Sequence, residues 1–455
     1  LYARGDEQIE VRLTAPTARH ELELTLAVRE GPPRRFLVSH HVAWGGDDGL
    51  DPVPVRVERD GEAFVLRPPP DGDVGRRFPD GAFRIVPHAG TPVARTGDDG
   101  LLFGDGISRA QPYFVIETGA TVQAGFMLRG ELVRAEPPAV RLEAADDLSW
   151  WRSAAGATRI SAPGSSPLAA GAARLGEILP WFAHDALVHY LAPRGLEQFS
   201  GGGWGTRDVC QGPVEMLLAL GRPAPVRDLL RRVFAQQNPD GDWPQWFMFF
   251  ERERSIRPDD AHGDIVFWPV RALARYLEAS GDASILDEQL PFFAPGGAEA
   301  GERATVAAHV ERALGLMRRR VIPGTSLAAY GHGDWNDSLQ PVDPEMRERL
   351  ASTWTVVLHH ETLSALAAAL AHVGRPGSEA LRAEAARIQS DFGRLLVADG
   401  VLAGFAQFHA DGRVGHLLHP RDAETGIHYR LLPMIHAIGA GLLAPGDAAR
   451  HVALI

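Results

Sequence analysis

Residues 225–234, with the sequence PVRDLLRRVF, indicate what kind of structure fills the second half of the chain. The apolar positions in this stretch recur at i, i+3, i+4, i+7 and i+8, and they are Val226, Leu229, Leu230, Val233 and Phe234. This spacing places them along one face of an amphipathic helix, and Pro225 suits its first turn. Similar patterns recur over residues 264–279, 303–320, 353–373 and 376–396. We therefore expect many helices, joined by glycine- and aromatic-rich loops without intervening strands, as in an α/α architecture.

The first part of the chain, up to about residue 140, follows a different period. Apolar and polar residues alternate over 21–28, ELELTLAV, and over 53–57, VPVRV, which is the signature of half-buried strands. Asp-Gly pairs lie between the apolar runs at 60–61, 80–81 and 99–100. This regular spacing of turn signals favours an antiparallel β-sandwich over a parallel sheet.

A stretch rich in serine, alanine, glycine and proline, residues 153–171, separates the two periods and suits a linker better than a core. The sequence thus predicts an α+β multidomain chain with an N-terminal antiparallel β-sandwich at 1–145, a linker at 146–180 and a helical domain at 181–455. The chain opens at Leu1 without methionine and ends at Ile455 within an apolar, helix-like stretch. We therefore expect a fragment of a longer polypeptide, with its helical domain incomplete at the C-terminus.

Composition excludes several functional classes. All 46 basic residues are arginine, so neither a phosphate-binding GK[ST] loop nor a Schiff-base lysine can occur in these 455 residues. Cys210 is the one cysteine, which rules out an intrachain disulfide. A net charge of −12 argues against general nucleic-acid binding. No run of 18 apolar residues and no leader peptide is visible, so we expect a soluble, cytoplasmic protein without direct membrane contact.

Aromatic, acidic and glycine residues crowd together at four places in the helical half. These are residues 199–211 (FSGGGWGTRDVCQ), 240–249, 259–268 and 331–338 (GHGDWNDS). A sugar explains this combination, because its C–H faces stack on indole rings and its hydroxyls form hydrogen bonds with carboxylates and arginine. Glycines let the backbone approach such a ligand closely. The sequence therefore predicts a carbohydrate site built from these loops.

Signals for other chemistries are weak. The histidine pairs at 40–41 and 359–360 lack the HExxH spacing, and neighbouring helix residues point apart, so no metal site is expected. No G-x-S-x-G motif occurs, and the glycines at 201–205 match a dinucleotide-binding loop poorly.

Three motifs together resemble glycoside hydrolase family 94, the inverting disaccharide and oligosaccharide phosphorylases. They are the WGTRD sequence at 204–208 with Gln211, the Asp264-x-x-x-Trp268 pair, and the GDWND sequence at 333–337. Residues 204–213, 331–341 and the LHPRD sequence at 418–422 are similar to the 1,2-β-oligoglucan phosphorylases and to the phosphorylase-like region of cyclic β-1,2-glucan synthases. The resemblance implies a β-sandwich, a helical linker and an (α/α)6 barrel, here incomplete, followed in the family by a small β domain.

The resemblance also implies roles for individual residues. Asp337, the second acid of GDWND, corresponds to the general acid, and Asp334 and Trp335 to neighbours that line the site. Arg207 and Asp208 correspond to a pair that holds the sugar at the cleaved position. The remaining expected substrate-binding positions are Trp204, Gln211, Asp264 and Trp268.

The implied reaction is inverting phosphorolysis of a β-glucan, with α-glucose 1-phosphate as product. An inverting hydrolase needs a second carboxylate to activate water, whereas phosphate is itself an anionic nucleophile and serves as co-substrate, so no cofactor is required. The phosphate ligands stay open: where the cellobiose and chitobiose members carry an arginine, this chain has glycines 201–203. Arg194 or Arg254 are candidates, and further ligands are expected beyond Ile455.

Two alternatives remain open at this point. The same scaffold could act as an inverting glycoside hydrolase or glycosyltransferase, with water or another sugar as acceptor. An incomplete barrel could also be a carbohydrate-binding fragment without turnover. The β-1,2 linkage depends on the resemblance alone, the parent chain is either a soluble phosphorylase or a membrane glucan synthase, and no feature indicates an oligomeric state.

Overall fold

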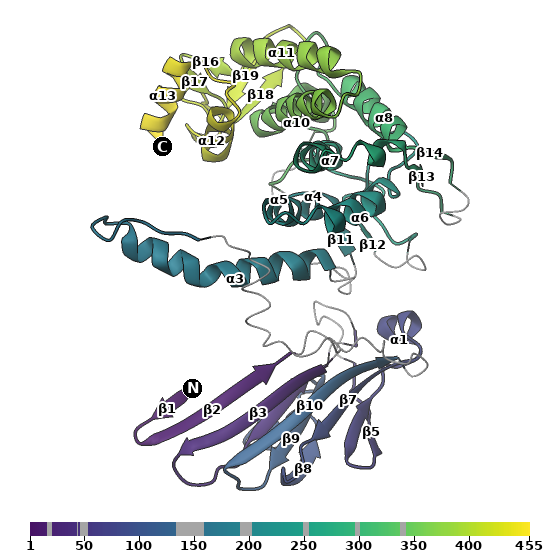
Figure 1. Cartoon of the computed structure of the whole chain (residues 1–455), viewed down its shortest axis with the longest axis vertical. Helices are drawn as coiled ribbons and strands as arrows, with labels where there is room; N and C mark the ends of the chain where they lie inside the picture. The colour runs from purple at the N-terminus through teal and green to yellow at the C-terminus, as the bar shows by residue number, and fades with distance from the viewer. Residues whose placement is uncertain are drawn as a thin grey trace. The chain divides into compact units, whose positions relative to one another are not determined.

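The computed structural model describes residues 1–15, 21–42, 44–45, 53–132, 159–191, 203–248, 254–295, 301–336 and 343–455. The chain divides into two compact units. One comprises Leu1–Arg159 with Gln198–Gly201, and the other Ile160–Glu197 with Gly202–Ile455 (Figure 1).

Two antiparallel sheets form the first unit. The larger sheet has the strand order β1-β2-β3-β10-β7-β6-β5, and its strands are Tyr2–Arg4, Glu7–Thr14, Glu21–Glu30, Gln123–Leu132, Gly81–Pro87, Ala63–Leu66 and Val57–Asp60. The smaller sheet has the order β4-β9-β8, with strands Leu37–His41, Tyr113–Thr118 and Val93–Gly97. Two short helices, α1 (Asp73–Arg77) and η1 (Asp99–Leu102), lie between strands.

A shared apolar core joins these two sheets. Phe64, Ile85 and Phe126 come from the larger sheet, and Phe114 and Ile116 come from the smaller one. Apolar side chains of the two sheets therefore face each other, which confirms the sandwich predicted from the period-two pattern.

Two local predictions in this unit were wrong. Of residues 53–57 only Val57 belongs to a strand, because Pro54 has no N–H to donate to a ladder. Asp99 and Gly100 form the 3-10 turn η1 rather than a hairpin turn. There the buried Asp99 carboxylate accepts hydrogen bonds from the Ser108 hydroxyl and the Arg109 amide and so ties the following loop together.

Helices dominate the second unit. They are α3 (Ala169–Leu191), α4 (Thr206–Val209), α5 (Gly212–Ala219), α6 (Pro223–Phe234), α7 (Phe267–Ser280), α8 (Val306–Arg319), α9 (Met346–Arg349), α10 (Thr353–His372), α11 (Ser378–Leu395), α12 (Leu431–Gly439) and α13 (Pro445–Leu454), with the 3-10 helix η3 (Ala283–Asp287). The helical periods predicted from the sequence correspond to α6, α7, α8, α10 and α11, which confirms them. Helix α3 begins at Ala169, so residues 169–180 of the predicted linker are helical.

Short strands interrupt the helices, contrary to the prediction of an α/α unit without strands. They are β11 (Gly203–Gly205) with β12 (Trp246–Met248), β13 (Gln289–Pro291) with β14 (Arg303–Thr305), β16 (Val397–Ala398) with β17 (Val401–Leu402), and the sheet β15-β18-β19 of Leu350–Ser352, Phe405–Phe408 and Val414–Leu417. Strands of two to four residues are too short to establish an alternating pattern, which explains why the sequence did not reveal them.

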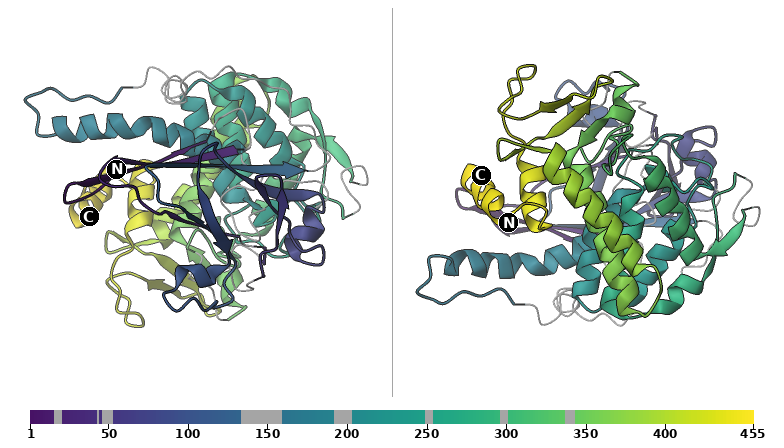
Figure 2. Two further views of the ribbon diagram at one scale, coloured as in Figure 1. Left: turned by 90° about the horizontal axis from the view of Figure 1, so that it is seen from below. Right: turned by 90° about the horizontal axis from the view of Figure 1, so that it is seen from above.

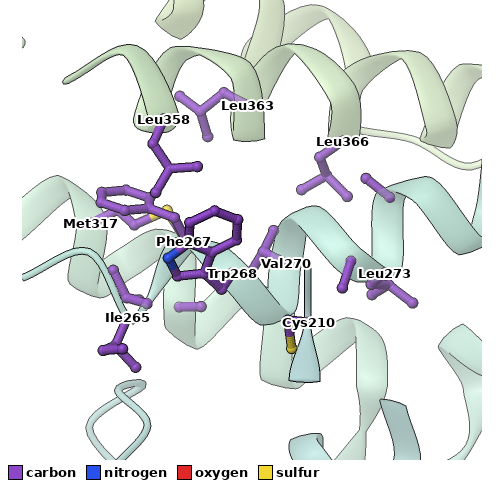
Figure 3. Close-up of a cluster of buried hydrophobic side chains, with 14 of the residues drawn as sticks. Cys210, Ile265, Phe267, Trp268, Val270, Leu273, Met317, Leu358, Leu363 and Leu366 are labelled. Atoms are coloured by element: carbon purple, nitrogen blue, oxygen red, sulfur yellow. The ribbon is translucent and has the colours of Figure 1, made fainter. Parts of the chain in front are cut away.

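The core of this unit lies around α10, between α7 and α11 (Figure 1). Helix α11 lies at its outer side, nearest the viewer in the right panel of Figure 2. Buried side chains of α7 meet those of α10 in Figure 3, among them Phe267, Val270, Leu273, Leu358, Leu363 and Leu366. Each such side chain contributes about 1.5–3 kcal/mol when fully buried, so this cluster fixes the loops at the helix ends. Among the described helices, none is long and apolar enough to span a membrane.

Candidate active site

Two loops that lie far apart in the sequence are joined through their backbones. The first loop precedes α7 and contains residues 262–264, and the second contains residues 331–336. His262 forms an isolated β-bridge with Gly331, and the Gly263 amide donates to the Gly333 carbonyl at 2.9 Å. A Cβ atom on Gly263 would lie 2.4 Å from the Tyr330 carbonyl oxygen, so only glycine allows this approach. The glycines of both motifs thus bring together the two loop ends that carry the acidic residues.

This close approach makes a testable prediction for Gly263→Ala. We expect a lower free energy of unfolding, by about 1–3 kcal/mol, because an added methyl group has to push two packed loops apart. Gly393→Ala in α11 is the matched control: a Cβ there meets nothing within 4 Å, and alanine favours a helix over glycine. Urea unfolding of the three proteins measures the difference, and an unfolding free energy for Gly263→Ala equal to wild type would contradict the predicted clash.

Asp264 lies at the centre of the first loop and is fully buried. Its Oδ2 accepts hydrogen bonds from Arg207 Nη1 at 3.3 Å and from Trp268 Nε1 at 2.9 Å. Its Oδ1 has no hydrogen-bond partner among the described residues. Burial raises the pKa of Asp264, the Arg207 guanidinium and the Trp268 bond oppose that rise, and the nearby charge of Asp334 adds to it. This oxygen is left without a hydrogen bond, which a water molecule or a ligand hydroxyl can supply.

Asp334, at the end of the second loop, is fully buried too. Its Oδ2 accepts a hydrogen bond from Ser352 Oγ at 2.5 Å and lies 3.6 Å from Arg430 Nη2. Its Oδ1 accepts the Asn336 amide at 3.0 Å, which closes a tight turn. Ser352 and Arg430 were not predicted from the sequence. Both lie outside the GDWND motif, and neither belongs to a recognisable motif of its own.

A row of indole rings runs alongside these carboxylates. The ring of Trp354 lies 6.0 Å from that of Trp268 and 6.1 Å from that of Trp335. Trp268 and Trp354 are buried, whereas Trp335 is 37 % exposed and so presents an aromatic surface to a ligand. Sequence reasoning also missed Trp354, since its position at the start of α10 reads as an ordinary apolar helix residue.

The other predicted residues on the 203–211 segment hold Arg207 in place or lie beside it. Trp204 is buried in β11 with its ring 6.1 Å from that of Phe247, so it packs within the protein. The Gln211 side-chain amide donates to the Arg207 carbonyl at 3.2 Å. Asp208 is half-buried. Burial of the Cys210 thiol raises its pKa, and the negative charge of Asp208 raises it further. The structure therefore brings together Arg207, Asp264, Trp268, Asp334 and Trp335.

Asp337 and Arg194 lie outside the described residues. Arg254 donates to the Ala235 carbonyl at 2.7 Å, beyond the end of α6.

The LHPRD sequence forms a turn within the fold. The Asp422 carboxylate accepts hydrogen bonds from the Leu418 amide and the Thr425 hydroxyl, and Leu418 has a positive φ of 52°. No group of three or more metal-ligating side chains occurs in the part of the chain that the structure describes.

Comparison with known proteins agrees with the motifs. No family model matches the chain. The chain is 40% identical over 287 residues to a 1,2-beta-oligoglucan phosphorylase of Listeria innocua serovar 6a. This match covers 62% of the chain and 26% of the relative. The chain is 27% identical over 226 residues to the cyclic beta-(1,2)-glucan synthase NdvB of Rhizobium meliloti, covering 47% of this chain and 7% of the relative. The similarity to 1,2-β-oligoglucan phosphorylases that the motifs predicted is thereby confirmed.

The chain spans about a quarter of the length of the first of these relatives. Among solved structures, a bacterial glucoamylase in complex with acarbose matches with a TM-score of 0.48 and 10% identity, over 88% of this chain and 57% of that one.

Proposed function

We propose that this chain is part of an inverting glycoside phosphorylase, which cleaves β-1,2-linked gluco-oligosaccharides with inorganic phosphate. The products are α-glucose 1-phosphate and a glucan shortened by one sugar. The observation that carries this proposal is the buried cluster of Arg207, Asp264 and Asp334 beside the open face of Trp335. Carboxylates and arginine recognise hydroxyl groups, and an indole stacks on a sugar face. The similarity to a 1,2-beta-oligoglucan phosphorylase supports the choice of reaction and linkage.

The binding residues have distinct roles in this proposal. Arg207 and Asp208 hold the sugar at the cleaved position, and the unpartnered Asp264 oxygen accepts one of its hydroxyl protons in a hydrogen bond. Trp335 stacks on a sugar ring, while Trp268 keeps Asp264 oriented through its indole N–H.

Chemistry then needs a single proton donor, which we assign to Asp337. Phosphate attacks the anomeric carbon from the face opposite the leaving oxygen, the glycosidic C–O bond breaks, and the Asp337 proton goes to that oxygen. Inversion of a β-linkage gives the α-phosphate. The donor has to be protonated near neutral pH, and nearby anions such as Asp334 and the incoming phosphate raise the pKa of a carboxyl group.

The helical residues belong to an (α/α)6 barrel that covers 181–455, after a sandwich at 1–145 and a linker at 146–180. Phosphate is a co-substrate and no cofactor takes part. We place the reaction in the cytoplasm, where the product, a doubly charged sugar phosphate, stays available because it does not cross a membrane.

The test is phosphate dependence. The whole protein to which this chain belongs is incubated with β-1,2-gluco-oligosaccharides with and without inorganic phosphate, and α-glucose 1-phosphate and free glucose are measured. We expect sugar phosphate only when phosphate is present, with β-1,3- and β-1,4-gluco-oligosaccharides as linkage controls. Glucose release without phosphate would indicate a hydrolase, and calorimetric sugar binding without any product would indicate a binding fragment. Either result contradicts the proposal.

A further inference from the structure

We infer that Arg430 is a positioning residue for this reaction: it holds Asp334, and through Asp334 the turn that precedes the general acid. The inference rests on the proposed function for the identity of that acid. Its structural part, the control of the 334–336 turn by Arg430, stands on contacts within the described residues.

Arg430 is fixed from several sides. It is the residue before α12, its side chain is 9 % exposed, and its guanidinium lies 4.3 Å from the centre of the Phe405 ring in β18. Phe405 in turn meets the Tyr330 ring edge-on at 5.4 Å. Tyr330 directly precedes the loop that carries Asp334, so Arg430 is packed against the base of this loop.

Charge explains what Arg430 does there. A fully buried carboxylate such as Asp334 is costly unless a cation and hydrogen-bond donors compensate it. Arg430 Nη2 lies 3.6 Å from Asp334 Oδ2, longer than a direct hydrogen bond. Ser352 fills this gap, because its hydroxyl accepts from Arg430 Nη1 at 3.2 Å and donates to Asp334 Oδ2 at 2.5 Å. Arg430 therefore holds this carboxylate both directly and through Ser352.

The other oxygen of Asp334 passes this constraint on to the loop. It accepts the Asn336 amide and closes the turn over Trp335. Asp337 is the next residue in the sequence. Arg430 and Ser352 thus hold one oxygen of the Asp334 carboxylate. Its other oxygen holds the backbone immediately before Asp337, the proposed acid. Displacement of a reacting group by about 1 Å can lower a rate about 100-fold, so this anchoring bears on turnover.

The other buried arginine of the site has a different carboxylate partner. Arg207 is paired with Asp264, the carboxylate of the other loop. Each buried carboxylate thus has its own arginine, and removal of Arg430 leaves Asp334 with the Ser352 hydroxyl and a backbone amide alone among the described contacts.

The test compares Arg430→Met, which keeps the bulk without the charge, with Arg430→Lys, which restores the charge. Arg413→Met is the control, since Arg413 pairs with Asp411 at the surface. We expect Arg430→Met to lower kcat about 100-fold with less than a threefold change in KM for the glucan, and Arg430→Lys to recover at least tenfold of that loss. We expect Arg413→Met to match wild type.

A second readout does not depend on turnover. Hydrogen exchange followed by mass spectrometry should show faster exchange in peptides spanning 331–336 for Arg430→Met, and wild-type exchange there for Arg413→Met. If Arg430 only packs on Phe405, the methionine variant retains both kcat and the exchange of these peptides, and the inference is overturned. If Arg430→Met does not fold, Ser352→Ala is compared instead, and unchanged exchange in that variant likewise overturns it.

The two proposals fail in different ways. Absence of sugar phosphate with the whole wild-type protein contradicts the proposed function, whereas the exchange of residues 331–336 still decides whether Arg430 holds the turn. Wild-type turnover with no effect of Arg430→Met contradicts the inference alone.

Discussion

Asp337→Asn is expected to lower kcat for phosphorolysis by about 10³-fold, within the range of 10² to 10⁴ that a general acid contributes. Asparagine keeps the shape of the side chain but has no acidic proton to give to the leaving oxygen. Sugar binding, measured by calorimetry, should change little, because the binding contacts come from Arg207, Asp264 and Trp335. The measurement is release of α-glucose 1-phosphate at saturating glucan and phosphate.

Asp343→Asn provides the matched control for this experiment. Asp343 is exposed, lies a short distance along the sequence, and accepts the Glu345 amide at 2.9 Å, a contact that asparagine can also make. We expect wild-type kcat for this variant. Sugar phosphate release by Asp337→Asn at the wild-type rate would rule out Asp337 as the acid.

Arg207→Met is expected to lower the free energy of unfolding by about 3–5 kcal/mol, and to reduce kcat/KM as well. Its partner Asp264 is fully buried, and removal of one member of a buried ion pair leaves an uncompensated charge. Urea unfolding measures the stability, with Arg413→Met as an exposed ion-pair control that should unfold as wild type does.

The double variant Arg207→Met with Asp264→Asn separates stability from function. With the carboxylate neutralised, no buried charge is left without a partner, so we expect the unfolding free energy to recover in part. Activity should not recover, because neither the guanidinium nor the carboxylate is available to the sugar. A double variant as unstable as Arg207→Met alone would show that packing of the arginine side chain, rather than its charge, accounts for the loss.

The helical half of the fold could be predicted well because its helices have a clear apolar period. Leu229, Leu230 and Val233 are all buried in α6, as the spacing requires. The prediction failed where an element was too short for a period, as in β11 and β12, or where proline removed a ladder donor, as at Pro54. In these places tertiary contacts determine the backbone, and sequence spacing carries little information about them.

The candidate site, too, could be predicted only in part from the sequence. Arg207, Asp264 and Asp334 could be predicted because motifs of glycine, aromatic and acidic residues surround them in the sequence. Trp354 and Arg430 could not, since each lies at a helix start that is not surrounded by such a motif. They join the site only because packing of α10, α12 and the sheet β15-β18-β19 brings them there. Such residues become visible through contacts between elements, which a sequence pattern does not record.

The backbone bridge between His262 and Gly331, together with the bond from Gly263 to Gly333, also limits how this site can respond to a substrate. The two loops cannot hinge independently without breaking these backbone hydrogen bonds, one of which comes from Gly263, where a Cβ atom would clash with Tyr330. A movement of the two loop backbones that brings Asp264 toward Asp334 therefore has to break this bridge. Rearrangements that leave the bridge intact are limited to side-chain rotations, to a joint shift of both loops, or to elements that carry neither carboxylate.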